Sequence, residues 1–359
     1  MSDASAANLA ENAKIVIAGA GAVGTYVGVR LAGAEPGSAP HSESAGRRVG
    51  FLGRPGLVEA ARTKGLVATD CDGGEVKLAP GRAEVSAEPG ILAGADLVIV
   101  ATKSRDTDAM ARDIAARAPE GAVVLSLQNG LRNVERLRAA LPGRDVRAGM
   151  IPFNVLMPEP GVVHRATRGD LRVQDSAGDL AALLTVEGLK THAHANLDGV
   201  MWAKLLINLN SALNALSGQT VLEQMADPAW RELWALCIEE GLAEARAAKV
   251  RPARLFGPPP WLMPRILRQP TKMFLFLTSM EKRVSEDARS SMQEDLNRRK
   301  PTEIDDLQGE ISRRAHARGA AAPVCRAVTT LIRQAEQAGE GPPMLTAARV
   351  AEMVRSGRG

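Results

Sequence analysis

The stretch Lys14–Ala32, KIVIAGAGAVGTYVGVRLA, predicts the fold of the N-terminal half of the chain. It begins with apolar, β-branched residues typical of a buried strand and ends with the spacing of an amphipathic helix. We expect Gly19 to make a tight turn, Gly21 to let a pyrophosphate approach the backbone, and Gly24 to let the helix pack on the strand. This context favours a Rossmann-type nucleotide site over a glycine-rich turn that binds nothing. The G-x-G-x-x-G pattern consists of Gly19, Ala20, Gly21, Ala22, Val23 and Gly24.

Two later segments predict further strands of one parallel sheet. ADLVIVATKS (95–104) and AVVLSLQNG (122–130) are continuous apolar runs with polar ends, and TDAMARDIAARA (107–118) between them has helical spacing. Strands buried on both faces look like this, and the strand–helix–strand order specifies a parallel pair. More strands are expected at 47–54, 147–155 and 170–175.

The hydrophobic pattern of the sequence changes near residue 196, where long stretches with helical spacing begin to dominate. They lie at 200–216, 229–249 and 305–319. We therefore predict an α/β fold in which an N-terminal Rossmann-type parallel-sheet domain is followed by an all-α domain. The domains predicted are a dinucleotide-binding domain at 14–195, a helical substrate and catalytic domain at 196–338, and a loose tail with one short helix at 339–359. Residues 1–13 read as a disordered lead and 33–46 as a surface loop.

Composition narrows the class of protein. The 359 residues carry a net charge of +4, with 45 basic residues scattered among 41 acidic ones. No basic, aromatic-rich face is visible, so nucleic acid is not an expected partner, whereas a small anionic ligand is. Cys71, Cys237 and Cys325 form no CxxC or ligand cluster, so we expect neither disulfides nor a metal site. No signal sequence or apolar run of about 20 residues is present, which favours a cytoplasmic protein without a membrane span. A homodimer is compatible with the sequence.

Three residues follow the ends of predicted strands and are candidate cofactor contacts. Arg54 stands where an acidic residue would select NAD, and a guanidinium there suits the 2′-phosphate of NADPH. It lies 30 residues after Gly24, against a usual spacing of about 20, and the 33–46 insertion accounts for the difference. Lys103 and Asn129 follow two other strands at the edge where ligands of such sheets bind. Asn129 could instead be a turn former, and Arg54 a plain surface arginine.

A lysine interrupts the first long apolar helix of the second half. Lys204 and Asn208 are four residues apart, so they share a helix face. A buried lysine without a nearby acid in the sequence is costly unless the site uses it, and burial lowers its pKa toward the range of a proton donor near neutral pH. The alternative is a lysine that reaches solvent or pairs with a distant carboxylate.

The segment 290–305, SSMQEDLNRRKPTEID, is also informative. Ser290, Ser291 and Asp295 are expected on one helix, which Pro301 ends. Thr302 is expected to cap the next helix and to place Glu303 in its first turn, where the helix dipole favours the ionised carboxylate. Glu303 is then either an acceptor for a substrate hydroxyl or for Lys204, or simply a carboxylate that stabilises its helix.

Together, the glycine turn, TKS at Lys103, QNG at Asn129, KLLIN at Lys204 and the 290–305 segment resemble the ketopantoate reductases (2-dehydropantoate 2-reductases) over residues 14–335. The resemblance implies NADPH-dependent reduction of ketopantoate to pantoate on the route to pantothenate and coenzyme A. It implies these roles: Lys204 as catalytic acid, Glu303 as an assisting acid in contact with substrate and cofactor, Asn208 and Ser291 as substrate ligands, Asn129 and Lys103 as cofactor or substrate contacts, and the glycine turn with Arg54 as the cofactor site.

The sequence departs from the family in two ways. Many members have another Asn four residues after the position of Asn208, but this chain has Ala212, between Asn210 and Asn214. Glycine- and proline-rich insertions lengthen it at 33–46 and 251–264. Two other functions therefore stay open: a related NADPH-dependent reductase of another 2-keto acid, and a sensor that binds NADP without turnover.

Overall fold

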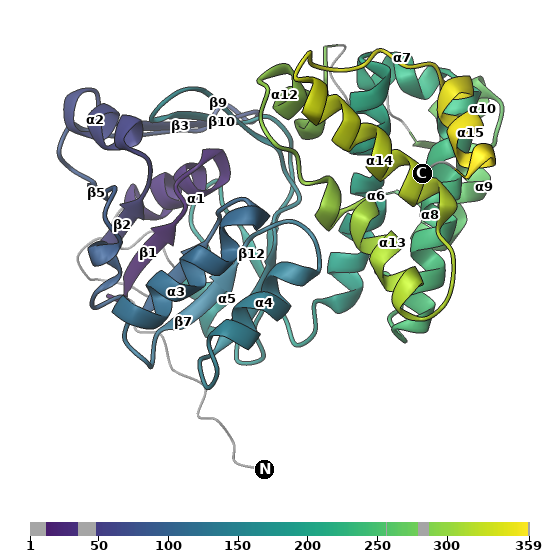
Figure 1. Cartoon of the computed structure of the whole chain (residues 1–359). Helices are drawn as coiled ribbons and strands as arrows, with labels where there is room; N and C mark the ends of the chain where they lie inside the picture. Colours follow the sequence, from purple (N-terminus) through teal and green to yellow (C-terminus); the bar gives the residue numbers. More distant parts are fainter. Residues whose placement is uncertain (1–11, 35–47, 256, 279–286, 358–359) are drawn as a thin grey trace. The chain divides into compact units, whose positions relative to one another are not determined.

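The computed structural model describes residues 12–34, 48–255, 257–278 and 287–357. The chain forms two compact units, which divide between Leu197 and Asp198 (Figure 1). This division lies two residues after the boundary expected from the sequence. Most of the expected N-terminal lead and of the 33–46 loop lies outside the described residues.

The first unit is built on an eight-stranded sheet that confirms the Rossmann-type prediction (Figure 1). Neighbouring strands are parallel, except that β11 is antiparallel to β8. In spatial order the strands are β12 (Thr191–His194), β11 (Leu171–Gln174), β8 (Val146–Met150), β7 (Val123–Ser126), β6 (Leu97–Val100), β1 (Lys14–Ala18), β2 (Arg48–Leu52) and β5 (Glu84–Ser86).

Helices connect these strands. Since β7, β6, β1 and β2 are parallel neighbours, the loops after all four strands gather at one edge of the sheet, and those loops carry the candidate cofactor residues. The helices are α1 (Ala22–Ala32), α2 (Pro55–Thr63), α3 (Thr107–Arg117), α4 (Arg132–Ala140) and α5 (Asp179–Leu184), with 3-10 turns η1 (Pro89–Leu92) and η2 (Ser104–Asp106).

A second sheet of four strands was not predicted from the sequence. Its order is β4 (Glu75–Leu78), β3 (Leu66–Asp70), β10 (Val162–Arg165) and β9 (Val155–Glu159). The strands are short and partly exposed, so their apolar pattern is weak. Helix α1 packs on this sheet as well as on β1 and β2, and residues Gly24–Leu31 are consequently all buried.

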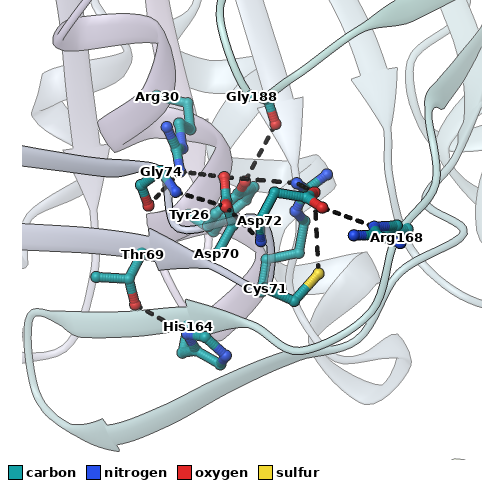
Figure 2. Close-up of polar contacts among 11 residues, drawn as sticks. Tyr26, Arg30, Thr69, Asp70, Cys71, Asp72, Gly74, His164, Arg168 and Gly188 are labelled. Carbon is teal, nitrogen blue, oxygen red and sulfur yellow. Dashed lines mark hydrogen bonds and ion pairs between the residues drawn. The ribbon is translucent and has the colours of Figure 1, made fainter. Parts of the chain in front are cut away.

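The contact between α1 and the second sheet contains a buried ion pair (Figure 2). Arg30 donates to Asp70 at 2.5 Å, and the two side chains are 2% and 3% exposed. The Asp70 carboxylate also lies 3.4 Å from Arg165, whose guanidinium pairs with Asp72. The Tyr26 hydroxyl donates to the carbonyl oxygen of Gly188. Arg30 is therefore the charged exception on a helix with a sheet on each side.

The described part of the second unit is helical, as predicted. Helix α6 (Asp198–Ser217) lies at its centre and packs on α7, α8, α12 and α14. The other elements are α7 (Val221–Ala226), α8 (Pro228–Ala247), η3 (Pro260–Leu262), α9 (Met263–Leu267), α10 (Thr271–Thr278), α12 (Ser291–Asn297), η4 (Ile304–Asp306), α13 (Gln308–Ala317), α14 (Pro323–Ala338) and α15 (Ala347–Ser356).

One expectation for this unit needs correction. The tail is packed, not loose: α15 lies against α8 and α14, Val350 is fully buried, and the Leu345 amide donates to the Leu216 carbonyl.

Cys237 and Cys325 are far apart in sequence but lie within hydrogen-bonding range in the core as free thiols, and burial raises the pKa of Cys325. Among the described helices, none has the length and apolar composition that a bilayer span requires.

We predict that Asp70→Asn lowers the free energy of unfolding by about 3–5 kcal/mol, because the substitution leaves the Arg30 guanidinium buried without its counter-charge. Urea denaturation measures the change. The control is Glu59→Gln, which breaks the exposed Arg62–Glu59 pair and should leave the midpoint unchanged. Equal midpoints for the Asp70 variant and the unsubstituted protein would contradict the prediction.

Candidate active site

The glycine turn has the geometry that its sequence predicts at Gly19. This residue has φ +96°, and a Cβ there would lie 2.7 Å from the Thr102 backbone nitrogen. The amides of Gly19 and Ala20 both donate to the carbonyl oxygen of Leu52, the last residue of β2. A side chain at Gly19 is therefore excluded twice, by the backbone conformation and by the loop after β6.

Gly24 and Gly21 are required for different reasons. A Cβ on Gly24 would lie 2.6 Å from the Gly19 carbonyl oxygen and 2.9 Å from Ile17 Cγ2, so α1 can approach β1 only at a glycine. A Cβ on Gly21, at the exposed N-cap of α1, would meet nothing within 4 Å. The folded chain itself therefore needs no glycine at position 21. The first turn of α1 contains no acidic residue, so its amides and dipole are suited to an anion.

Arg54 lies beside this turn. It is the exposed residue before α2, two positions after the end of β2. The preceding residue, Gly53, packs so closely on Ala20 that an added Cβ would lie 3.3 Å from the Ala20 Cβ. The backbone that carries Arg54 is thus in contact with the turn where a nucleotide phosphate would bind.

Buried amide side chains hold the loops that carry Lys103 and Asn129. Gln128 Nε2 donates to the carbonyl oxygen and hydroxyl of Thr102 and to the Thr107 hydroxyl. Asn133 Nδ2 donates to the Asn129 carbonyl oxygen and to Ser104 Oγ, both at 2.7 Å. Lys103 is exposed and Asn129 partly exposed at this edge. Neither Gln128 nor Asn133 was singled out from the sequence, although the polarity of Gln128, two residues after the buried strand β7, was a usable signal. Asn133 lies within α4 and had no such signal.

In the second unit, Lys204 lies on α6 and is electrostatically coupled to Glu303, which stands 99 positions later in the chain. Lys204 is partly exposed as a residue, but burial around its ammonium group lowers its pKa from 10.5 to about 8, and the negative charge of Glu303 opposes this shift. The expectation for Glu303 needs correction, because it precedes the 3-10 turn η4 instead of lying in the first turn of an α-helix. Thr302 Oγ1 accepts from the Ile304 amide, but Thr302 is not the cap residue that the sequence suggested, because Glu303 occupies the N-cap position of that turn.

The asparagines around Ala212 have structural roles. Ala212 is fully buried. The amide groups of Asn210 and Gln224 exchange two hydrogen bonds, and Asn214 donates to the Gln219 carbonyl while accepting from the Ser290 amide. The side-chain amides of Asn210 and Asn214 are therefore engaged by residues within the helical unit. Asn208 is partly exposed on the same helix face as Lys204.

The start of α12 differs slightly from the prediction. Ser290 caps the helix: its Oγ accepts from the Gln293 amide and donates to the Ser211 carbonyl of α6. Ser291 is the exposed first residue of α12, and Asp295 lies one turn further along the helix. Ser290 thus positions α12, whereas the hydroxyl of Ser291 is accessible to a ligand.

Comparison with known proteins places both units in one family. The family model described as "Ketopantoate reductase PanE/ApbA" matches residues 15–178, and the model of the family's C-terminal domain matches residues 196–336. The chain belongs to the ketopantoate reductase PanE/ApbA family. This membership confirms the resemblance seen in the sequence and makes the chain an oxidoreductase.

Individual relatives of the ketopantoate reductase family match nearly the whole chain. The 2-dehydropantoate 2-reductase of Halobacterium salinarum is 28% identical over 91% of this chain and 100% of its own. The PanE/ApbA family ketopantoate reductase of Ralstonia eutropha JMP134 is 30% identical, covers 91% and 99%, and superposes with a TM-score of 0.76. D-mandelate dehydrogenase, solved with NADH and anilino(oxo)acetate, shares the fold at 23% identity and a TM-score of 0.73, over 91% and 99%.

We predict that Lys204→Met raises the free energy of unfolding at pH 7 by at most about 3 kcal/mol. The folded-state pKa of about 8 lies below the ordinary 10.5, so the charge opposes folding below pH 8 and stops doing so between pH 8 and 10.5. Urea denaturation at pH 7 and pH 10.5 should show a gain that shrinks at the higher pH.

The matched control is Lys272→Met, which replaces an exposed lysine of α10 and should change neither value. A stabilisation by Lys204→Met of the same size at both pH values would contradict the assignment of the effect to a buried ammonium.

Proposed function

We propose that this protein reduces 2-dehydropantoate (ketopantoate) to pantoate with NADPH, as a step of pantothenate and coenzyme A biosynthesis. One observation carries the proposal: α6 of a ketopantoate reductase family chain bears a lysine whose pKa is about 8, coupled to Glu303. Such an amine is largely protonated near pH 7 and can still release its proton, as a general acid must.

The residues at the sheet edge fit a dinucleotide. Open space over Gly21 leaves room for a pyrophosphate against the backbone, and the amides at the start of α1 would bind it. The exposed Arg54 would pair with a 2′-phosphate, and Lys103 and Asn129 would contact the cofactor from the adjoining loops. When bound, the reduced nicotinamide supplies the hydride.

The residues of the second unit would bind and protonate the substrate. Lys204 would face the carbonyl oxygen, stabilise the negative charge that grows there and donate the proton that completes the alcohol. Glu303 helps to keep the amine protonated against its burial. Asn208, one helical turn from Lys204, and the hydroxyl of Ser291 would bind the substrate's polar groups. Asn129 is a further candidate for this contact.

Two alternative functions differ from the proposed one in substrate or in turnover. A reductase of another 2-keto acid uses the same chemistry, and the 28% identity to named 2-dehydropantoate 2-reductases and the buried Ala212 leave room for a different substrate. A sensor would bind NADPH without oxidising it. The low pKa of Lys204 favours an enzyme over a sensor, because a sensor needs no proton donor.

The deciding assay follows NADPH oxidation with ketopantoate and with pyruvate, 2-oxobutyrate and phenylglyoxylate. We expect the highest kcat/KM for ketopantoate, and a kcat for reduction that falls as the pH rises through about 8, because Lys204 must start protonated. Lys204→Ala should lower kcat by about 10²-fold or more, the usual contribution of a positioned proton donor.

Lys272→Ala, at an exposed position, serves as the control and should keep full activity. A higher kcat/KM for one of the simpler keto acids would favour the other reductase, and NADPH binding without turnover on any of them would favour the sensor.

Cofactor preference is tested at Arg54. We predict that Arg54→Ser raises the KM for NADPH by roughly 10- to 100-fold, the loss of charge-assisted bonds to a phosphate, and leaves the KM for NADH nearly unchanged. Arg62→Ser, at an exposed position of α2, should change neither constant. An equal loss with both cofactors would exclude recognition of the 2′-phosphate by Arg54.

A further inference from the structure

The segment that carries Glu303 is an irregular turn, so its position depends on side-chain anchors. Residues 300–303 form no helix, and η4 spans three residues before α13 begins at Gln308. Two anchors join this turn to α14: the Thr302 amide donates to Glu336, and Asp305 pairs with Arg333. Neither anchor involves α6, which carries Lys204.

Gln308 links the turn to α6 directly. Its Nε2 donates to the Leu209 carbonyl oxygen at 2.6 Å, across 99 positions of the chain. Leu209 is the residue after Asn208 and lies five positions after Lys204. The bond therefore joins the first residue of α13 to α6 within two turns of the lysine.

If Gln308 only filled space, burying its polar side chain would cost free energy without a compensating role. Gln308 and Leu209 are both 0% exposed, and the Gln308 Oε1 is buried without a hydrogen-bond partner among the described residues. A buried polar atom in this state costs free energy, and a Leu or Met side chain would fill similar space without that cost. The amide is better explained by the single bond that it makes to α6.

We propose that Gln308 is a positioning residue, whose bond to the Leu209 carbonyl fixes the Glu303 turn in register with Lys204. The inference rests on the proposed function for its catalytic meaning. The contact itself is a property of the folded chain and can be measured without substrate.

The consequence is a change in the ionisation of Lys204. The charge of Glu303 raises the pKa of Lys204 against burial, so a turn that moves away should let this pKa fall below about 8. The other charged groups on the elements that contact α6 have the following partners or positions. On α7 and α8 they are Glu223 in its capping box, Arg231 with backbone carbonyls of 225–269, Glu232 and Glu239 with Arg268, Glu240 with the amides of Val324 and Cys325, Glu244 with Arg318, and Arg246 with the Leu242 carbonyl. On α12, α13 and α14 they are Glu294 and Asp295, the buried Glu310 with Arg313 and Arg314, the exposed Arg326, Arg333 with Asp305, and Glu336 with Thr302; the Arg314 guanidinium also lies over the ring of Trp202 on α6.

The experiment compares Gln308→Leu with Gln308→Met, which serves if the first variant folds poorly. The rate of acetylation of Lys204 by acetic anhydride is followed against pH by mass spectrometry, relative to Lys272, and gives the pKa of Lys204 without any assay of turnover. We expect Lys204 to react roughly two- to tenfold faster at pH 7 in the Gln308 variants, because a lower pKa leaves more neutral amine.

Two further variants separate positioning from general loosening. Glu303→Gln should speed the reaction in the same direction, and adding Gln308→Leu to it should cause no further change. Gln224→Leu removes another fully buried glutamine that bonds to α6, through Asn210, away from the Glu303 turn. It should lower the melting temperature without altering the labelling of Lys204.

The proposal would be overturned by an unchanged pKa of Lys204 in the Gln308 variants, or by a shift of this pKa in Gln224→Leu as large as the shift in the Gln308 variants. A labelling shift in a protein that fails to reduce any keto acid would uphold the positioning role and reject the proposed function, so the two failures are distinguishable.

Discussion

Helix α6 places the ammonium group of Lys204 among apolar side chains, and the hydrogen bonds of the surrounding helices hold this helix in position. Most of the helix is buried, so its polar groups need partners from neighbouring helices. Trp234 of α8, Gln308 of α13 and Ser290, the N-cap residue of α12, each donate a side-chain hydrogen bond to a backbone carbonyl of α6. These three bonds fix the neighbouring helices on the one that bears Lys204. Geometry around the lysine is therefore specified by bonds as well as by apolar packing.

Strong local patterns were enough to predict the class of each unit, a parallel-sheet unit followed by a helical one. The Lys14–Ala32 stretch specified β1, the turn and α1, because a strand period, three glycines and a helix period follow one another without interruption. The four-stranded sheet was missed because β4 and β9 are short and mostly exposed, so burial does not impose a clear period on their residues. The packing of α15 also escaped prediction, since its anchor at Leu345 pairs with a backbone carbonyl that no pattern reveals.

The candidate site could be predicted as residue types but not as contacts. An isolated lysine in an apolar helix was visible in the sequence, and so was Glu303 after a proline. Their coupling depends on a turn joined to α6 through Gln308, which lies 99 positions from its partner. The roles of Asn210 and Asn214 likewise depended on Gln224 and Ser290, which only the folded chain brings to them. Long-range hydrogen bonds leave no period in a sequence, so they mark the limit of this kind of prediction.

The position of α1 between two sheets bears on how the chain would receive an anion. Apolar packing and the buried Arg30–Asp70 pair hold this helix along its length, so its N-terminal amides have a fixed direction before anything binds. A ligand there would lose its own freedom but would not have to order the helix. The four short strands of the second sheet thus hold the N-terminal end of the first helix in a fixed orientation, in which its amides would meet an anion.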